Sequence, residues 1–283
     1  MTLVVESPGL LTLVQDLGRP GLGHLGVSPS GAFDRSALRQ VNLVLGNEAG
    51  AAALEVLRGG LVLRAEAPAW MAVTGGAGSI TVDGDTQAYG RAIRLQPGQR
   101  LALGAPTAGL RAYVGVAGGF AVPEELGSRS TDTLAGLGPA ALRADERLAV
   151  GTATHPPGIE DVPTLGRTGE LMLDVILGPR DDWFTTAAVR RLLESPWQVS
   201  PAANRVGVRL TGPVLERSRH DELPSEPCVR GSIQVSADGQ PIVFGPDHPV
   251  TGGYPVIAVV LDRHTDRLAQ AAPGQAVRFG RVG

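Results

Sequence analysis

Glycine and proline interrupt this chain at intervals too short for a protein built from long helices. The 283 residues include 39 glycines and 22 prolines, which end helices and favour tight turns between short strands. The chain is long enough for two compact domains or for one large β domain with a buried core. We therefore expect a mainly β protein.

Apolar stretches between these turns predict the strands, because alternating or continuous apolar runs bounded by glycine, proline or polar clusters are typical of β-structure. In the first half the predicted strands are 3–5, 10–15, 53–57, 61–64, 69–74, 79–82, 92–95, 100–103 and 111–117. In the second half they are 171–177, 206–211, 232–236, 241–244, 255–261 and 276–280.

Two segments have the spacing of a helix. One spans about residues 34–45, with leucine and valine on one face and Asp34 or Ser30 as its N-cap. The other spans about 185–194 and ends before Pro196. One helix therefore falls in each half of the chain.

Three stretches recur in the same order along the chain, which indicates an internal duplication. Residues 73–76 recur at 250–253, residues 97–104 recur at 273–280, and residues 33–39 resemble 184–190. Each half then looks like a small barrel or curled sheet with one covering helix. The predicted boundaries are an N-terminal half at 1–150, a Pro/Gly-rich linker at 151–168 and a C-terminal half at 169–283.

The charged residues exclude several classes of function. A net charge of −3 gives no basic field for nucleic acid or for an anionic membrane. Every basic side chain except histidine is arginine, so the chain has no Walker A lysine, no lysine Schiff base and no lysine to carry biotin. Bound anions must be held by arginine, by backbone N–H groups or by a metal.

The cysteine and histidine content and the length of the apolar runs exclude further kinds of site. Cys228 is the single cysteine, so no intrachain disulfide forms, and a buried or incidental thiol is expected. The five histidines show no paired ligand spacing, so we predict no metal site. No apolar run reaches membrane-spanning length, and the first residues lack a basic signal region. We expect a cytoplasmic protein without membrane partners.

The loop at 15–34 is the densest polar segment of the first half. Residues 21–26 match G-x-G-x-x-G, but the prolines and glycines that follow cannot continue a helix, so we reject a dinucleotide site. Long ordered loops of this kind are usually functional. The alternative gives Asp16 and Arg19 a turn-fixing salt bridge and makes Asp34 only an N-cap.

Other polar clusters stand beside predicted strands. Residues 127–132 carry three hydroxyls, an arginine and a carboxylate, a set that ligates phosphate or carboxylate, with Asp132 orienting the arginine or a metal. A polar turn is the equally weighted alternative. In the second half the large polar groups beside strand ends are Asn204, Arg205, Glu226, Gln234 and Tyr254. Such positions commonly rim the mouth of a barrel, although they also satisfy backbone groups in turns.

The motifs together resemble one family, that of the C subunit of 5-oxoprolinase, also called KipA-like, allophanate hydrolase subunit 2-like or biotin-dependent carboxyltransferase-like. The stretches that carry the resemblance are 8–12, 14–21, 24–27, 29–34, 109–119, 126–132, 204–207 and 251–255. The resemblance covers essentially the whole chain. It implies two cyclophilin-like β-barrel halves, each with a covering helix.

The same resemblance implies a function in a complex. Such proteins act with a LamB/YcsF-like A subunit together with a KipI-like B subunit, opening the small cyclic amide 5-oxo-L-proline to L-glutamate with ATP and Mg²⁺ shared among the subunits. A lactam is a poor electrophile, so phosphorylating its oxygen explains the need for ATP. The family also contains KipA-type regulators that bind a KipI-like partner, and carboxyltransferase components of urea carboxylase. With no lysine, this chain carries no attached biotin.

Under this interpretation two groups of residues form the site. The predicted catalytic residues are Asp16, Arg19, His24, Ser30, Asp34, Ser128, Arg129 and Asp132. The predicted substrate-binding residues are Asn204, Arg205, Glu226, Gln234, Thr251 and Tyr254. Because an anionic substrate needs several converging donors, we expect the loop 15–34 and residues 204–205 to meet across a cleft between the halves, with Glu226 and Tyr254 nearby.

Overall fold

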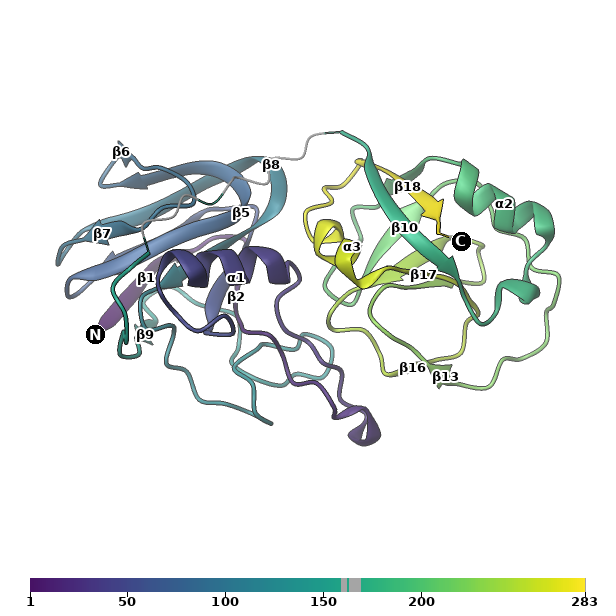
Figure 1. The fold of residues 1–283 in the computed structure, drawn as a ribbon, viewed down its shortest axis with the longest axis horizontal. Helices are drawn as coiled ribbons and strands as arrows, with labels where there is room; N and C mark the ends of the chain where they lie inside the picture. The colour runs from purple at the N-terminus through teal and green to yellow at the C-terminus, as the bar shows by residue number, and fades with distance from the viewer. Residues whose placement is uncertain (159–161, 163–168, 283) are drawn as a thin grey trace. The chain divides into compact units, whose positions relative to one another are not determined.

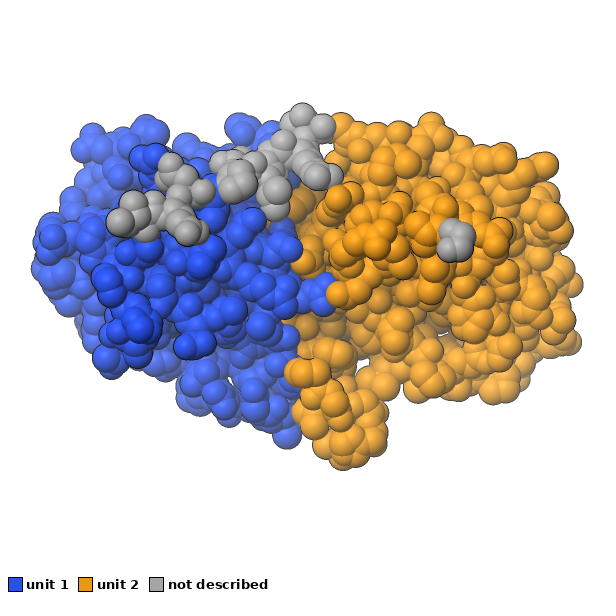
Figure 2. Space-filling view, viewed as in Figure 1, with its two compact units in different colours: residues 1–19, 34–132, 136–168 blue, residues 20–33, 133–135, 169–283 orange. Residues whose placement is uncertain are grey.

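The computed structural model describes residues 1–158, 162 and 169–282. Within these residues the chain is mainly β, with three short α-helices (Figure 1). It divides into two compact units, coloured separately in Figure 2. Unit 1 contains residues 1–19, 34–132 and 136–168, and unit 2 contains residues 20–33, 133–135 and 169–283. The mainly β prediction is confirmed.

Unit 1 is built on a nine-stranded sheet whose paired strands are antiparallel, with β2-β3-β8-β4-β1-β9 in order and β5 pairing with β6, β7 and β8. Its elements are β1 (Thr2–Pro8), β2 (Leu11–Gln15), α1 (Arg35–Val44), β3 (Ala53–Leu57), β4 (Leu61–Ala65), β5 (Ala69–Val82), β6 (Asp85–Thr86), β7 (Ile93–Leu95), β8 (Arg100–Val116) and β9 (Arg147–Ala149). Helix α1 packs against β5 and β8 (Figure 1).

Strands β5 and β8 correct the sequence interpretation, which divided each of them into two. The glycines read as breaks are bulges inside one long strand: the register between β5 and β8 shifts three times between Gly75 and Ile80. A Cβ on Gly78 would lie 2.9 Å from the carbonyl oxygen of Ala105, so the close approach of the two backbones requires glycine there.

Unit 2 is a closed barrel of seven strands in the order β10-β17-β14-β15-β12-β11-β18. Its elements are β10 (Leu171–Leu177), the 3-10 helix η2 (Asp181–Trp183), α2 (Thr186–Glu194), β11 (Trp197–Val199), β12 (Gly207–Thr211), β13 (Glu226–Pro227), β14 (Ser232–Val235), β15 (Pro241–Phe244), β16 (Thr251–Gly252), β17 (Val256–Val260), α3 (Asp262–Leu268) and β18 (Ala276–Arg281). The barrel closes where β10 pairs in parallel with β18. Strands β13 and β16 form a separate two-stranded ribbon.

The two predicted helices are confirmed, and each begins at a side-chain cap. The Asp34 carboxylate accepts the Ala37 N–H at 2.9 Å, and the Thr185 hydroxyl accepts the Ala188 N–H at 3.1 Å. Helix α3 was not predicted, because its residues are mostly polar and no side chain caps its N-terminus.

The recurring V-T-G-G sequence does not mark equivalent elements. Residues 73–76 lie inside the long strand β5, whereas 250–253 surround the two-residue strand β16. Of the predicted linker, residues 151–158 pack on unit 1, where the Gly158 N–H donates to the Val44 carbonyl at 2.8 Å. Residues 159–161 and 163–168 of that linker lie outside the described residues. In the described chain, no helix is long and apolar enough to cross a membrane.

A polar network is buried inside unit 1. The apolar runs that predicted these strands did not indicate it. The Tyr113 hydroxyl, fully buried on β8, donates to the Glu55 carboxylate at 2.6 Å and accepts the Asp34 N–H at 2.7 Å. Arg111 Nε lies 3.4 Å from the other oxygen of Glu55. Burial, followed by the negative charges of Glu55 and Asp34, holds the pKa of Tyr113 well above its usual value, so the phenol keeps its proton and remains a donor.

Replacing Tyr113 by phenylalanine should destabilise the protein by about 1–3 kcal/mol, because a buried carboxylate loses a donor and a buried N–H loses its acceptor. Urea unfolding of Tyr113→Phe measures the change. Tyr254→Phe is the matched control, since its side chain is half exposed and its change should stay within about 0.5 kcal/mol. Equal midpoints for the two variants would contradict a structural role for this network.

Candidate functional site

One end of the barrel in unit 2 gathers polar side chains around the segment 251–256. At this end β10 and β14 finish and β17 begins, since Leu177 pairs with Ala258 and Gln234 pairs with Val256. We call this group the barrel-end cluster, and it consists of Arg180, Arg217, Glu226, Gln234 and Tyr254. Three of its members were predicted from the sequence as substrate-binding residues.

Hydrogen bonds to the backbone of the segment hold the cluster in place. The Gln234 side-chain amide donates to the carbonyl of Tyr254 at 3.0 Å. The Pro255 carbonyl accepts the N–H of Val235, and the Val256 carbonyl accepts the N–H of Arg180. The predicted residue Thr251 contributes through its backbone, since β16 pairs with β13 beside Glu226.

The close packing around position 252 requires glycine there. A Cβ there would lie 2.5 Å from Gln234 Nε2 and 3.2 Å from Cys228 Sγ. The amide of Gln234 can therefore reach the Tyr254 carbonyl only because position 252 has no side chain. Burial, followed by the charge of Glu226, raises the pKa of the Cys228 thiol, which matches the buried, unreactive thiol expected from the sequence.

Two arginines of the cluster have different partners. Arg180 forms a fork with Glu226: its Nε lies 2.9 and 3.0 Å from the two carboxylate oxygens, and its Nη2 also donates to that carboxylate. Arg217 donates from Nη2 to the Val235 carbonyl at 2.6 Å, and its Cζ lies 5.6 Å from the centre of the Tyr254 ring. Sequence reasoning missed both arginines, because each is an isolated residue in a loop.

The opposite end of the barrel contains a second polar group, centred on Asp247. This carboxylate has no exposed surface. It accepts Arg205 Nε and Nη2, each at 2.9 Å, the Ser30 hydroxyl at 2.7 Å, and both the N–H and hydroxyl of Thr133 at 2.9 and 2.7 Å. Arg205 Nη2 also donates to the Gly31 carbonyl at 2.6 Å.

The Asp247 group is a structural tie. Burial acts to raise the pKa of Asp247, but the charge and hydrogen bonds of Arg205, with those of Thr133, outweigh it and hold the pKa below its usual value. Five donors saturate a carboxylate that offers about four lone-pair sites. Arg205 and Ser30 therefore hold the Asp247 carboxylate in place, and their predicted part in a ligand site stays a prediction.

The predicted approach of the loop 15–34 to Arg205 is found at Ser30 and Gly31. The expectation that Glu226 and Tyr254 lie nearby is wrong, because Arg205 precedes β12 at the end of the barrel opposite Tyr254. Asn204 caps a turn, where its side-chain oxygen accepts two backbone N–H groups of the next residues. A cleft between the halves stays a prediction.

In unit 1 the structure brings together the two polar motifs at 15–19 and 127–132. The Asp16 carboxylate accepts the hydroxyls of Ser128 and Ser130 at 2.6 and 2.5 Å and the N–H groups of Arg129 and Gly18 at 2.6 and 2.7 Å. These contacts join segments more than 100 residues apart. Asp16 is therefore an acceptor that fixes the second motif, and the catalytic roles predicted for Asp16 and Ser128 stay predictions.

Arg19 does not form the salt bridge with Asp16 that the sequence alternative suggested. Its Nη2 donates to the Ser130 carbonyl at 2.5 Å and its Nε to the Glu125 carbonyl at 3.3 Å. Arg129 reaches outward, where its Nη1 lies 2.8 Å from Glu124. The buried guanidinium of Arg19 thus holds main-chain carbonyls, as Asp16 holds N–H groups.

The structure gives the remaining predicted catalytic residues other local roles. Asp34 caps α1. The backbone of Asp132 closes a turn, accepting Gly136 N–H at 3.0 Å and donating to the Leu137 carbonyl at 2.9 Å. His24 is exposed on the 3-10 helix η1 (Gly23–Leu25). Within either unit, the eight predicted catalytic residues do not form one constellation.

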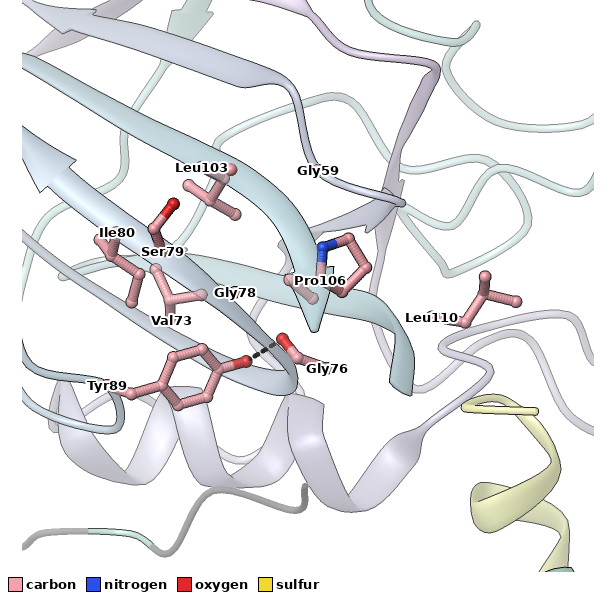
Figure 3. Close-up of a pocket in the computed structure, with 12 residues that line it drawn as sticks. Gly59, Val73, Gly76, Gly78, Ser79, Ile80, Tyr89, Leu103, Pro106 and Leu110 are labelled. Atoms are coloured by element: carbon pink, nitrogen blue, oxygen red, sulfur yellow. Dashed lines mark hydrogen bonds between the residues drawn. The ribbon is translucent and has the colours of Figure 1, made fainter. Parts of the chain in front are cut away.

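A small hollow with a cavity volume of about 10 Å³ lies in unit 1 beside the bulged part of β5 and β8 (Figure 3). Its wall is formed by apolar side chains and by glycines such as Gly59, Gly76 and Gly104. The Tyr89 hydroxyl donates to the Gly76 carbonyl, drawn as a dashed line in Figure 3, and burial followed by the charge of Asp34 raises the pKa of Tyr89. This lining offers a ligand little beyond apolar contact, so the barrel-end cluster is the better candidate.

Among the residues that the structure describes, no group of three or more His, Cys, Asp and Glu side chains is arranged to hold a metal ion. The donors of the barrel-end cluster are two guanidinium groups, an amide and a phenol ring, beside one carboxylate already engaged by Arg180. This set suits an anionic or amide ligand.

Removing the charge of Asp247 should lower stability at pH 7 by about 3–5 kcal/mol, because Arg205 loses its buried counter-ion. The folded pKa of Asp247 lies below the unfolded value near 4, so its contribution is present above about pH 4 and is lost as the pH falls through the folded pKa. Asp247→Asn should therefore flatten the acid limb of stability against pH, measured by urea unfolding between pH 3 and 7.

Thr133→Ala is the milder variant, expected to cost about 1–3 kcal/mol, in case Asp247→Asn does not fold. The exposed Asp238→Asn is the control, and its effect should be far smaller. An Asp247→Asn protein with wild-type pH dependence would show that the carboxylate is not the acid-sensitive group.

Comparison with known proteins gives the family context. Residues 25–281 match the family model described as carboxyltransferase domain, subdomain A and B. The chain is 37% identical over 284 residues to the C subunit of 5-oxoprolinase from Escherichia coli (strain K12), covering 98% of this chain and 90% of that protein. It is 30% identical over 306 residues to urea amidolyase of Saccharomyces cerevisiae, covering 97% of this chain but 16% of that protein.

A solved structure agrees with the sequence matches. The crystal structure of K. lactis urea amidolyase superposes with a TM-score of 0.93 at 30% identity, covering 100% of this chain and 19% of that chain. The chain thus corresponds to a small part of the fungal enzymes and to nearly all of one bacterial subunit. These matches confirm the resemblance inferred from the motifs, and the chain belongs to the carboxyltransferase domain family, subdomain A and B.

Proposed function

We propose that this chain is a non-autonomous subunit of an ATP-dependent 5-oxoprolinase that opens 5-oxo-L-proline to L-glutamate in the cytoplasm. The observation that carries the proposal is the match to the E. coli 5-oxoprolinase protein, which extends over 98% of this chain and 90% of that relative. The partners in this proposal are a KipI-like B subunit with a LamB/YcsF-like A subunit. The E. coli relative is itself named as the C subunit of its enzyme, which supports a role within a complex.

The barrel-end cluster suits the substrate side of this reaction. A lactam resists attack because its nitrogen lone pair delocalises into the carbonyl, and ATP supplies the activation by making the amide oxygen a leaving group. In our proposal the nucleotide and Mg²⁺ are shared with the partner subunits, whereas the guanidinium groups, amide and ring around residues 251–256 hold and orient the small amide.

A second candidate is the carboxyltransferase component of a biotin-dependent urea carboxylase. The family model and the K. lactis urea amidolyase structure favour it. This chain spans only 19% of that enzyme, and it contains no lysine to carry biotin, so another protein would have to deliver carboxybiotin. A KipA-type regulator is the third possibility, in which binding of a KipI-like partner needs no catalytic residue.

Reconstitution tests the proposal directly. The purified chain should release no glutamate from 5-oxo-L-proline with MgATP, and activity should appear when the A and B subunits of the E. coli enzyme, or those encoded beside this chain, are added. The assay measures glutamate and ADP together and expects them in equal amounts. Full activity from the chain alone, or no activity in an assembled complex, would overturn the proposal.

Glu226 provides a variant that separates an enzyme from a regulator. Glu226→Gln removes the charge that engages Arg180 without changing side-chain size, and should lower turnover by the assembled complex about tenfold while leaving assembly intact. Glu170→Gln is the matched control, because Glu170 pairs with Arg278 elsewhere on the same barrel at 2.7 Å. Turnover is measured by ADP release, and assembly by size-exclusion chromatography. Equal turnover of the two variants would remove Glu226 from the site.

A further inference from the structure

Arg217 differs from the other guanidinium group of the barrel-end cluster in having no acidic partner. Its side chain is half-buried in the loop between β12 and β13. Its contacts are the Val235 carbonyl at 2.6 Å and the face of the Tyr254 ring. In the described parts of the chain, no carboxylate lies within salt-bridge distance of it. A half-buried guanidinium without a carboxylate partner keeps its charge available to an anionic ligand.

The neighbouring arginines show the contrast. Arg180 is neutralised by the fork with Glu226. Arg219, two residues along the same loop, pairs with Asp182 at 3.1 Å, and both side chains are about half exposed. The same loop also carries the carboxylates of Glu216, Asp221 and Glu222. Among its described arginines, Arg217 is the one without a carboxylate partner, and it lies beside the half-exposed ring of Tyr254.

Arg217 uses few of its donors within the protein. A guanidinium group has five N–H donors in one plane, and Arg217 spends one Nη2 donor on a carbonyl while its Cζ lies over the Tyr254 ring. The N–H groups along its edge are those that bind a carboxylate with two parallel hydrogen bonds. A ligand held at this edge would lie next to the Tyr254 ring.

The position of Tyr254 is also fixed in advance. Gln234 holds the Tyr254 carbonyl, and Gly252 leaves room for that amide. The main chain that carries the Tyr254 ring is therefore held in place before any ligand binds. Such preorganisation reduces the conformational entropy that binding would otherwise cost.

We propose that Arg217 and Tyr254 form a binding site for the carboxylate of a small planar ligand. Arg217 donates two hydrogen bonds to the carboxylate, and the Tyr254 ring supports the flat part of the ligand. The identity of that ligand as 5-oxo-L-proline rests on the function proposed above, whereas the specificity for a carboxylate rests on the geometry of this cluster. Arg217 thus determines specificity between an acid and its neutral analogue.

The experiment titrates the purified full chain with 5-oxo-L-proline and with 5-oxo-L-prolinamide, the same lactam without its negative charge, and follows binding by ligand-observed NMR. The wild-type chain and Arg219→Gln should bind the acid about tenfold or more tightly than the amide. Arg217→Gln should bind the two ligands equally, and Arg217→Lys should restore only part of the discrimination, because a point charge cannot form the paired hydrogen bonds.

Tyr254→Leu serves as a second variant on the exposed side of the cluster. It should weaken both ligands by a similar factor, because it removes the supporting ring and keeps the charge of Arg217. Circular dichroism melting confirms that each variant is folded. The proposal is overturned if the wild-type chain binds neither ligand, if it binds acid and amide equally, or if Arg217→Gln keeps the discrimination.

The experiments distinguish a failure of this carboxylate site from a failure of the proposed 5-oxoprolinase function. An assembled complex that turns over 5-oxo-L-proline while Arg217→Gln keeps wild-type discrimination would leave the function standing and remove this site. Arg217-dependent binding of the acid by a chain whose complex shows no turnover would keep the carboxylate site and remove the 5-oxoprolinase assignment.

Discussion

The carboxylate of Asp247 is the interaction on which the architecture of unit 2 depends. It has no exposed surface and binds donors from Ser30, Thr133 and Arg205, which come from three distant parts of the sequence. Two of these segments, 20–33 and 133–135, interrupt the sequence of unit 1. A buried carboxylate is stable only while all its hydrogen-bond donors are present. Asp247 therefore joins the barrel to both of these segments, 20–33 and 133–135.

Whether a polar residue is buried depends on tertiary packing, which the sequence pattern does not show. Strands and helices were predictable wherever turns bound an apolar run, as in β3, β10 and α1. Glu55 was not identified, because a glutamate among apolar residues suggests a solvent-facing position, and here both faces of β3 are buried. Asp247 sits between prolines in what the sequence presents as an exposed turn, and only the segments that cover it make it buried.

Tertiary packing also decides which of the predicted site residues lie together. The motifs at 15–19 and 127–132 do meet, and most of their polar groups bond to one another, although Gln15 Oε1 and Arg19 Nη1 are buried without a hydrogen-bond partner. The predicted catalytic role of these motifs stays a prediction. Glu226, Gln234 and Tyr254 converge on one end of the barrel. Arg180 and Arg217, which give that end its chemistry, carry no sequence signal, because an arginine in a loop resembles any solvated residue until its neighbours are known.

The excursion of residues 20–33 affects how this chain can be divided. Phe33 is fully buried in the hydrophobic core of unit 2, with Leu173, Trp197 and Phe279, and Arg230 donates to its carbonyl. A polypeptide beginning at residue 169 would therefore have a cavity where the Phe33 ring packs, and Asp247 would lose two partners, Ser30 and Thr133. Proteolysis or gene splitting at the predicted linker would not release two autonomous domains, and circular permutants would have to keep this early segment joined to the barrel.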